Sequence, residues 1–317
     1  MCYFLNIRKL FKMKKLLLTG ATGFIGGFLS LGYNNLRCVV RETETNIFDD
    51  CYRIDRIDGR TCWKKAFYDV DAVIHLAGLA HSGDFSYAEY KEVNVDGSIN
   101  LAKAAASFGV KRFVFISSIG VNGTSTCENP FKYDSLPNPH NVYAQSKYDA
   151  EIGLKKIAEE TGLEVVIVRP TLVYGLEAPG NFGMLTKLVS KLPFLPFGST
   201  NNRRDFIAVQ NLADLLVTCA THPDAAGHTF LASDGETVSI KQFTNAIADG
   251  LGKKVIQLPV PVSVMRLAGK LTGKSSKIEQ LYGNLEVDSS NIKDVLGWTP
   301  PLTMKQAMST LCDSGVK

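Results

Sequence analysis

Short apolar runs alternate with segments of helical spacing through the first 170 residues. The apolar runs lie at 15–18, 71–77, 112–116 and 163–168. Each is long enough for a buried strand and ends in small or polar residues. Between them, 94–108 and 141–161 repeat apolar residues at the period of a helix. The alternation predicts an α/β fold of Rossmann type, with a doubly wound parallel sheet and right-handed crossovers.

The pattern loosens after Gly175, where prolines at 179, 193 and 196 interrupt it. This region predicts a smaller substrate-binding lobe over the carboxyl ends of the strands. The lobe is discontinuous, because 206–218 and 229–231 have the pattern of segments that return to the sheet. The expected sheet domain covers 13–175 and about 203–233. The lobe covers about 176–202 and 234–317, and 1–12 form an N-terminal extension.

Composition narrows the class of protein. The chain has 45% apolar residues and a net charge of +4, which is too slight to indicate a nucleic acid partner. Its seven scattered cysteines predict neither a disulfide framework nor a metal site, and they fit a reducing cytoplasm. No run approaches the roughly 20 apolar residues of a membrane span, and 1–12 lack a signal-peptide core. We therefore expect a cytoplasmic protein without stable membrane insertion.

The first apolar run ends in a glycine-rich turn, Thr19-Gly20-Ala21-Thr22-Gly23-Phe24-Ile25-Gly26. Glycine permits a tight turn and a close approach of phosphate oxygens. The N–H groups and dipole of the following helix favour an anion. An ordinary strand-to-helix turn is the alternative, but the position of the motif favours a dinucleotide site.

Tyr143 and Lys147 are four residues apart and so project from one side of a helix. A lysine ammonium near a phenol lowers the pKa of the phenol toward working pH, which suits a general acid/base. Tyr87 and Lys91 have the same spacing, and we interpret them as a surface pair. Only the later pair follows a strand that ends in serines, 117 and 118, at the expected position of the nicotinamide. His75, inside an apolar run, is expected to be a packed core histidine.

Further motifs occur in a fixed order. They are Asp71-x-Val-Ile-His-Leu-Ala77, Asn94-Val-Asp-Gly97, Phe113-Val-Phe-Ile-Ser-Ser118, Arg169-Pro170, Val173-Tyr174-Gly175, Gly180-Asn181-Phe182, Arg203-Arg204-Asp205-Phe206-Ile207 and Gly297-Trp298-Thr299-Pro300-Pro301. With the glycine turn and the Tyr/Lys pair, the chain resembles an extended short-chain dehydrogenase/reductase of the nucleotide-sugar epimerase/dehydratase group. The resemblance runs from about Lys14 to Met308.

The resemblance implies roles for individual residues. Tyr143 is the expected general acid/base, Lys147 holds the nicotinamide ribose, and Ser118 rather than Ser117 binds the reacting oxygen. Asn181 and Arg204 are expected substrate contacts, with Arg204 on the nucleotide diphosphate. A solvated surface charge beside Arg203 is the alternative for Arg204. The expected cofactor contacts are Gly20, Thr22, Gly23, Phe24, Ile25, Gly26, Arg41, Leu76, Ala77, Gly78, Asn94, Lys147 and Pro170.

One subset is most similar, through 115–123, 169–182 and 285–288, and acts on UDP-N-acetylhexosamine derivatives in surface-polysaccharide synthesis. Some members reduce a 4-keto-6-deoxy sugar at C4, and others are UDP-sugar 4-epimerases. Arg41 ends the second strand, where arginine accommodates the 2′-phosphate of NADP, although Glu42 could accept the ribose of NAD. NADP favours the reductase of a UDP-4-keto-6-deoxy-N-acetylhexosamine over the epimerase.

Three other expectations complete the interpretation. The resemblance suggests a homodimer packed through helices such as 94–108 and 141–161. A non-catalytic dinucleotide-binding sensor or structural subunit is the alternative from another class, and it is disfavoured by Ser118, Tyr143 and Lys147. The basic segment 270–277 is expected to be a solvated surface, although it could approach phosphate.

Overall fold

A parallel sheet of seven strands organises the computed structural model, which describes residues 14–44, 48–80 and 85–314. The expected N-terminal extension lies outside these residues. The strands are β1 (Leu16–Thr19), β2 (Leu36–Arg41), β3 (Cys51–Ile54), β4 (Ala72–His75), β5 (Arg112–Ile116), β6 (Glu164–Pro170) and β10 (Thr229–Ala232). Their order is β10-β6-β5-β4-β1-β2-β3, and every neighbouring pair is parallel. The predicted α/β fold is confirmed.

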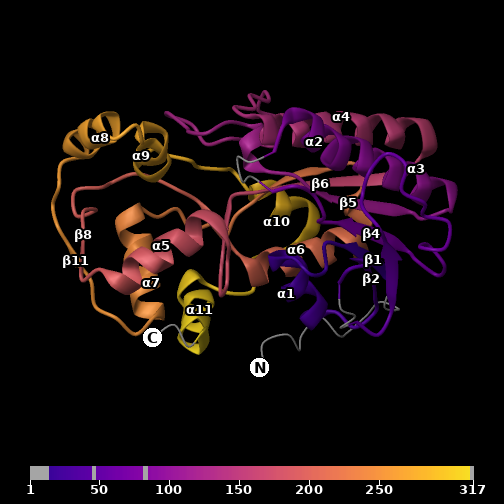
Figure 1. Cartoon of the computed structure of the whole chain (residues 1–317), viewed down its shortest axis with the longest axis horizontal. Helices are drawn as coiled ribbons and strands as arrows, with labels where there is room; N and C mark the ends of the chain where they lie inside the picture. The colour runs from indigo at the N-terminus through magenta and orange to yellow at the C-terminus, as the bar shows by residue number, and fades with distance from the viewer. Residues whose placement is uncertain (1–13, 45–47, 81–84, 315–317) are drawn as a thin grey trace.

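Helices cover both faces of the sheet (Figure 1). On one face lie α1 (Phe24–Gly32) and α6 (Val209–Thr221); on the other lie α3 (Ser98–Ser107) and α4 (Val142–Thr161). The chain leaves β1 toward β2 and β3, then returns to β4 on the opposite side of β1. Ligands of open α/β sheets bind at the carboxyl end of such a switch point. The topology thus places a site beyond β1 and β4.

One strand of the sheet was predicted from the sequence, and another was not. The expected return of 229–231 to the sheet is confirmed, because β10 pairs with β6. The edge strand β3 was not predicted, since its four residues Cys-Tyr-Arg-Ile are short, partly polar and only partly buried. Its position beside β2 comes from tertiary pairing rather than from a local apolar pattern.

The helix predicted at 94–108 begins earlier than expected. A capping box of Ser86 and Glu89 starts α2 (Tyr87–Tyr90), and a π-helical segment, Lys91–Gly97, joins it to α3. The wider π turn carries Asn94 into the interior, where it is buried. By contrast, α4 has the expected bounds, because Asn141 caps its first turn and Gly162 ends it in a left-handed conformation.

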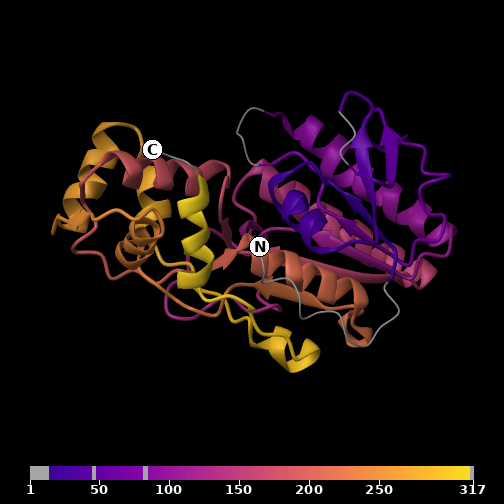
Figure 2. The same cartoon turned by 90° about the horizontal axis from the view of Figure 1, so that it is seen from below.

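Beside the sheet, a second group of elements forms what we call the lobe (Figures 1 and 2). Its members are α5 (Gly180–Lys191), β8 (Phe194–Leu195), α7 (Ile240–Gly250), β11 (Ile256–Gln257), α8 (Val262–Leu271), α9 (Ser275–Tyr282) and α11 (Met304–Ser309). A separate apolar cluster forms its core, in which the rings of Phe206 and Phe243 stack 3.7 Å apart. Two parallel strands, β7 (Leu172–Tyr174) and β9 (Phe206–Ala208), lie between the sheet and the lobe. The short helices are η2 (Ile119–Val121), η3 (Pro223–Ala225) and η4 (Thr310–Ser314).

Part of the C-terminal region packs on the sheet rather than in the lobe. Helix α10 (Ser290–Leu296) contributes Ile292 and Leu296 to the core against α6 and β10. The indole N–H of Trp298 donates to the Asp214 carboxylate of α6 at 2.7 Å. Residues 290–298 thus belong with the sheet rather than with the lobe to which the sequence assigned them, and the remaining domain boundaries stay a prediction.

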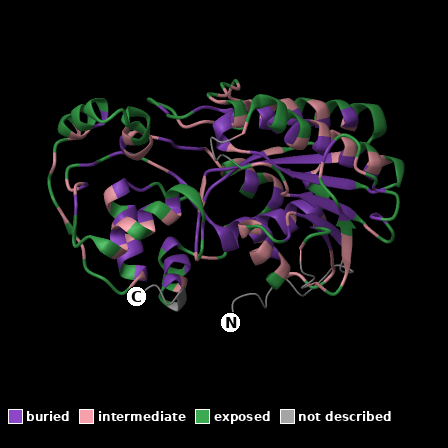
Figure 3. Cartoon of the chain, in the orientation of Figure 1, coloured by how far each residue is buried: buried purple, intermediate pink, exposed green. Residues whose placement is uncertain are grey.

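The burial of the residues agrees with this arrangement, because the sheet strands are buried and α8 is exposed (Figure 3). In the described part of the chain, no helix is long and apolar enough to cross a bilayer.

Candidate active site

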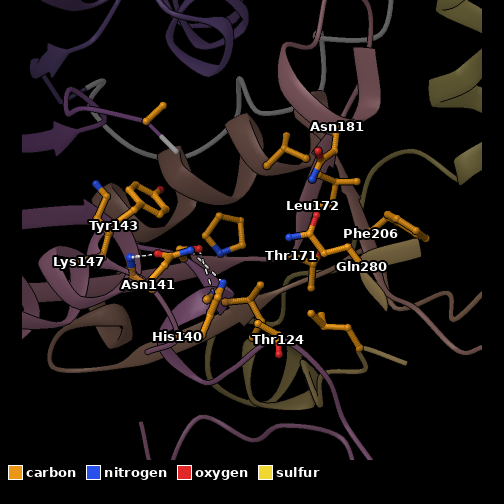
Figure 4. Close-up of a pocket in the computed structure, with 18 of the residues that line it drawn as sticks. Thr124, His140, Asn141, Tyr143, Lys147, Thr171, Leu172, Asn181, Phe206 and Gln280 are labelled. Carbon is orange, nitrogen blue, oxygen red and sulfur yellow. Dashed lines mark hydrogen bonds between the residues drawn. The ribbon is translucent and has the colours of Figure 1, made fainter. Parts of the chain in front are cut away.

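A cavity of about 680 Å³ lies where the carboxyl ends of the strands meet the lobe. Its size is in the range of small-molecule sites. Nine of the residues predicted from the sequence line it, namely Ile25, Leu76, Gly78, Ser118, Tyr143, Lys147, Pro170, Asn181 and Arg204. They come from the ends of β4, β5 and β6, from α1 and α4, and from the lobe side. Figure 4 shows Tyr143 and Lys147 on one side of the cavity and Asn181 and Gln280 on the other.

The glycine turn after β1 has the geometry of a phosphate cradle. Gly20 adopts φ +74°, and a Cβ on Gly26 would lie 2.1 Å from the Gly20 carbonyl oxygen. Helix α1 then begins with no side-chain cap on its first N–H groups. Those N–H groups and the helix dipole suit an anion, and the absence of side chains lets it approach the backbone. The residues therefore fit the pyrophosphate of a nicotinamide dinucleotide.

Tyr143 and Lys147 share the first turns of α4, where Lys147 is buried against β5 and Tyr143 is partly buried at the cavity. The Lys147 ammonium donates to the carbonyl of Ile116 at 3.1 Å and lies 4.8 Å from the centre of the Phe115 ring. Burial lowers the pKa of Lys147 to about 8, an effect that the nearby Glu151 carboxylate opposes. Lys147 therefore lies at the end of β5, in an environment that lowers its affinity for a proton.

The phenol of Tyr143 is in a different electrostatic state from the one expected. Burial raises its pKa to about 12, the neighbouring Tyr90 adds to the rise, and a hydrogen bond with Ser118 lowers it. The expectation that Lys147 lowers the pKa of Tyr143 toward working pH is therefore wrong for this arrangement, because burial dominates and the ammonium is directed at Ile116. Tyr143 is protonated at neutral pH, as a proton donor requires.

The two serines after β5 have separate partners. The Ser117 hydroxyl donates to the Glu151 carboxylate at 2.5 Å, inside a buried network in which Arg169 also pairs with Glu151. Ser118 lines the cavity, and its hydroxyl accepts from the Gly120 amide at 3.0 Å. Both serines line the cavity, but the Ser117 hydroxyl is committed to the buried Glu151 carboxylate. This difference favours Ser118, whose role in binding the reacting oxygen stays a prediction.

A buried hydrogen-bonded chain holds the ends of β1 and β4 together. The Ser98 hydroxyl donates to the Asn94 carbonyl, so it accepts from Nε2 of His75 at 2.9 Å. Nδ1 of His75 then accepts from the Thr19 hydroxyl at 2.7 Å, and Thr19 accepts from the Ala77 amide at 3.1 Å. Because the Ser98 hydroxyl proton is already donated to Asn94, the proton between His75 and Ser98 must come from Nε2 of His75. His75 is therefore the neutral tautomer with its proton on Nε2. The expected core position of His75 is confirmed.

This histidine makes the fold sensitive to acid. Burial lowers its pKa to about 3, from 6.5 in the unfolded chain, and Lys147 adds to the shift. Between these values the unfolded chain binds the extra proton, so the free energy of unfolding decreases as pH falls from about 6.5 toward 3. We expect His75→Asn to flatten this decrease by up to about 1.4 kcal/mol per pH unit in urea titrations. The exposed His228→Asn serves as control and should leave the slope unchanged; equal slopes for all three proteins would contradict the expectation.

Arg204 and Arg203 differ in environment. Arg203 is mostly exposed and pairs with Glu286 at 2.7 Å. The Arg204 side chain is partly buried, lines the cavity, and donates to the Gly283 carbonyl at 2.9 Å. Burial lowers its pKa to about 10, and no carboxylate of the described residues forms an ion pair with it. The alternative of a solvated surface charge is therefore excluded for Arg204, and its role as a diphosphate contact stays a prediction.

The other predicted cofactor contacts lie outside the cavity lining. Gly20, Thr22, Gly23, Phe24 and Gly26 form the turn below it, and the Ala77 amide bonds Thr19. The buried Asn94 bonds both backbone groups of Leu79, and its amide also reaches Ser146 on α4. It therefore positions the loop after β4 against α4.

Arg41, the last of the predicted cofactor contacts, pairs with Glu44, a residue that was not among the predicted contacts. It ends β2, and its guanidinium pairs with the Glu44 carboxylate at 3.1 Å. Glu44 also accepts from the Arg41 amide at 3.0 Å and from the Thr22 hydroxyl at 3.1 Å. Partial burial raises the pKa of the Glu44 carboxyl, but these hydrogen bonds outweigh it and lower the pKa overall. An anionic carboxylate thus stands between the glycine turn and Arg41.

Sequence reasoning missed several residues around the cavity. They include Thr124, His140, Asn141, Thr171 and Gln280. Lys277 also lines the cavity, so this part of the segment 270–277, expected to be a solvated surface that could approach phosphate, does face the site. Asn141 donates toward His140 at 3.0 Å while its carbonyl caps α4 (Figure 4). Only the capping pattern of Asn141 was visible in the sequence, because the others come from loops and from α9, whose path depends on tertiary packing. No cluster of His, Cys, Asp or Glu suited to a metal occurs among the described residues.

Comparison with known proteins agrees with this geometry. The family model described as the NAD dependent epimerase/dehydratase family matches residues 16–233. A Vibrio cholerae protein named UDP-glucose 4-epimerase is 43% identical over 92% of this chain and 93% of its own length. Two solved structures share the fold: UDP-glucuronic acid 4-epimerase from Bacillus cereus in complex with NAD (TM-score 0.73, 20% identity, 94% and 97% coverage) and RMD from Pseudomonas aeruginosa complexed with NADPH (0.71, 21%, 95% and 99%). The model spans the glycine turn, Ser118 and the Tyr143/Lys147 pair, and the chain is therefore a member of the NAD-dependent epimerase/dehydratase family, an enzyme of the extended short-chain dehydrogenase/reductase type.

Proposed function

We propose that the enzyme interconverts the C4 epimers of a UDP-hexose or UDP-N-acetylhexosamine and keeps NAD bound throughout the cycle. The observation that carries the proposal is the position of Glu44. A carboxylate at the end of β2, beside the glycine turn, suits the ribose 2′-hydroxyl of NAD and repels the 2′-phosphate of NADP. Its ion pair with Arg41 also neutralises the guanidinium that favoured NADP in the sequence argument. The name of the 43% identical relative, UDP-glucose 4-epimerase, supports the same activity.

The side chains around the cavity supply the proton chemistry. A nicotinamide held beside Ser118 and Lys147 would supply the hydride chemistry at the sugar C4, and delivery of the hydride to the opposite face of the C4 ketone would give the epimer. In the oxidising half, Tyr143 as phenolate accepts the proton of the C4 hydroxyl, and in the reducing half its phenol gives the proton back. The Ser118 hydroxyl hydrogen-bonds the same oxygen. Burial keeps the Tyr143 pKa high, so the phenol needed in the reducing half is the resting form, and the hydrogen bond with Ser118, which lowers that pKa, favours the phenolate of the oxidising half.

The lobe side of the cavity suits the nucleotide diphosphate. Arg204 presents a guanidinium that no carboxylate of the described residues neutralises, and Lys277 lines the same cavity. A planar guanidinium binds phosphate oxygens in two places, which fixes the orientation of the ligand. Asn181, at the start of α5, adds an amide near the expected sugar. A diphosphate held by the lobe would bring the sugar C4 toward Tyr143.

The second candidate is the C4-ketone reductase, with NADPH as the reductant. Arg41 favours it, because its side chain is mostly exposed at the end of β2 and would meet a 2′-phosphate once Glu44 moved aside. The two candidates use Ser118, Tyr143 and Lys147 in the same way. They differ in whether the reduced cofactor is consumed, so the cofactor decides between them.

One experiment separates the two candidates. Protein purified without added cofactor is denatured and the released dinucleotide identified, while native protein is incubated with UDP-glucose and with UDP-N-acetylglucosamine. We expect bound NAD and formation of the C4 epimer of at least one sugar without added cofactor. Oxidation of NADPH in a fixed ratio to a UDP-4-keto-6-deoxy-N-acetylhexosamine, with no epimer formed, would establish the reductase instead.

The role of Glu44 has its own test. We expect Glu44→Gln to raise the affinity for NADP relative to NAD by about tenfold, because the loss of one charge-assisted interaction near the ribose is worth about 1.5 kcal/mol or more. Glu42→Gln is the matched control, since Glu42 is an exposed acid two residues away. Binding of both cofactors is measured by titration of protein freed of its dinucleotide. A shift in the Glu42 variant alone would show that Glu42 accepts the ribose.

A further inference from the structure

Helix α8, at the far end of the lobe, carries an apolar stripe that the protein itself does not cover. Val264, Leu267 and Leu271 are 51%, 58% and 80% exposed, and Ala268 beside them is also exposed. Their spacing puts all four on one side of the helix. The opposite side packs inward, through Val262 and Met265 on the lobe core and Gly269 against Ile278 of α9. The stripe is therefore additional to the face that anchors α8.

Basic residues lie on α8 and on the segment that leads into α9. Between 262 and 282 the chain has four basic residues, Arg266, Lys270, Lys274 and Lys277, and a single acid, Glu279. That acid pairs with Arg266 at 2.8 Å. No carboxylate of the described residues forms an ion pair with Lys270 or Lys274. This short segment therefore carries a net charge of +3, in a chain whose net charge is +4.

From these two features we infer that α8 and the turn to α9 form a docking surface for an anionic lipid bilayer. An amphipathic helix lies in the interface of a bilayer with its apolar side chains among the acyl chains and its lysines at the anionic headgroups. A second copy of the chain fits less well, because a symmetric contact would bring the two basic surfaces together. A nucleic acid would meet the lysines but leave the apolar stripe exposed to water.

The surface adjoins the active site. Helix α9 packs on α8, and its residues Lys277, Gln280 and Leu281 line the cavity. Binding through α8 would therefore hold the lobe side of the cavity at the membrane while the sheet stays in water. This docking does not depend on which sugar the enzyme converts.

The test is sedimentation of the full-length protein with vesicles. One set contains phosphatidylcholine and phosphatidylglycerol in about equal parts, and the other contains phosphatidylcholine alone. We expect binding to the anionic vesicles, weaker binding to the neutral ones, and release by salt. The double variants Leu267→Glu/Leu271→Glu and Lys270→Glu/Lys274→Glu should each lower partitioning by about tenfold or more. Neither should change turnover of a soluble nucleotide sugar, because none of these four residues lines the cavity.

Matched controls keep the test specific. Leu136→Glu removes an 88% exposed leucine from a loop outside the lobe, and Lys64→Glu/Lys65→Glu reverses two exposed lysines near the sheet. Both should sediment like the wild type. The inference is overturned if the wild type does not bind anionic vesicles or if the α8 variants bind as well as the controls. It is also overturned if the α8 variants lower the oligomeric mass in light scattering, or if a chain starting at Met13 loses all binding while α8 is intact.

Discussion

Replacing Tyr143 by phenylalanine is expected to lower kcat by about 10²–10⁴-fold, the range that a positioned general acid/base contributes. The phenolic oxygen is removed from the cavity, while the ring stays packed 6.0 Å from that of Tyr90. The loss is expected to be large because phenylalanine has no group that can exchange a proton with the C4 oxygen. Steady-state epimerisation and a thermal melt would show lost turnover with retained fold and retained cofactor.

A matched control lies in the chain itself. Tyr87 and Lys91 repeat the spacing of Tyr143 and Lys147, but Tyr87 is half-exposed and donates to Asp149 at 3.2 Å, and Lys91 pairs with Asp96. Tyr87→Phe should therefore turn over substrate at the wild-type rate. If Tyr143→Phe retained near wild-type kcat, another group would have to carry the proton, and the proposed reaction at the end of β5 would be wrong.

Much of this site was predictable because it is attached to the ends of parallel strands. Such strands end at one edge of the sheet, so residues that follow apolar runs meet there even when the runs are far apart in the chain. Gly78 after β4, Ser118 after β5 and Pro170 in β6 all reach the cavity on that basis. The helix pattern around Tyr143 was equally direct, since Asn141 and Gly162 mark both ends of α4.

Other parts depend on contacts that no local pattern encodes. Glu44 affects the cofactor argument only because its side chain turns back to the Arg41 amide and the Thr22 hydroxyl. The π-helical segment that buries Asn94 has the same sequence character as an ordinary helix. Lys147 was expected to act on Tyr143, but its hydrogen bond to the Ile116 carbonyl and the burial of both groups decide their pKa values. Each of these is a tertiary effect that overrides a local preference.

The second large effect is expected at Gly26. In Gly26→Ala the new Cβ would lie 2.1 Å from the Gly20 carbonyl oxygen and 2.8 Å from the Ala21 Cα, and both are backbone atoms that no rotamer change can move. The turn must therefore open, which displaces the N–H groups that would hold the pyrophosphate. We expect loss of bound dinucleotide and a fall of about 1–3 kcal/mol in the free energy of unfolding, the range for overpacked sites.

The next residue shows whether the effect belongs to the turn or to glycine in general. A Cβ on Gly27 meets nothing within 4 Å, although Gly27 lies in the same helix. Gly27→Ala should keep its dinucleotide and gain about 0.5–1 kcal/mol, because alanine loses less backbone entropy in a helix. The readouts are cofactor released per protein and urea unfolding of protein freed of cofactor. If the two variants behaved alike, close packing of Gly26 on Gly20 would not be what shapes the cofactor seat.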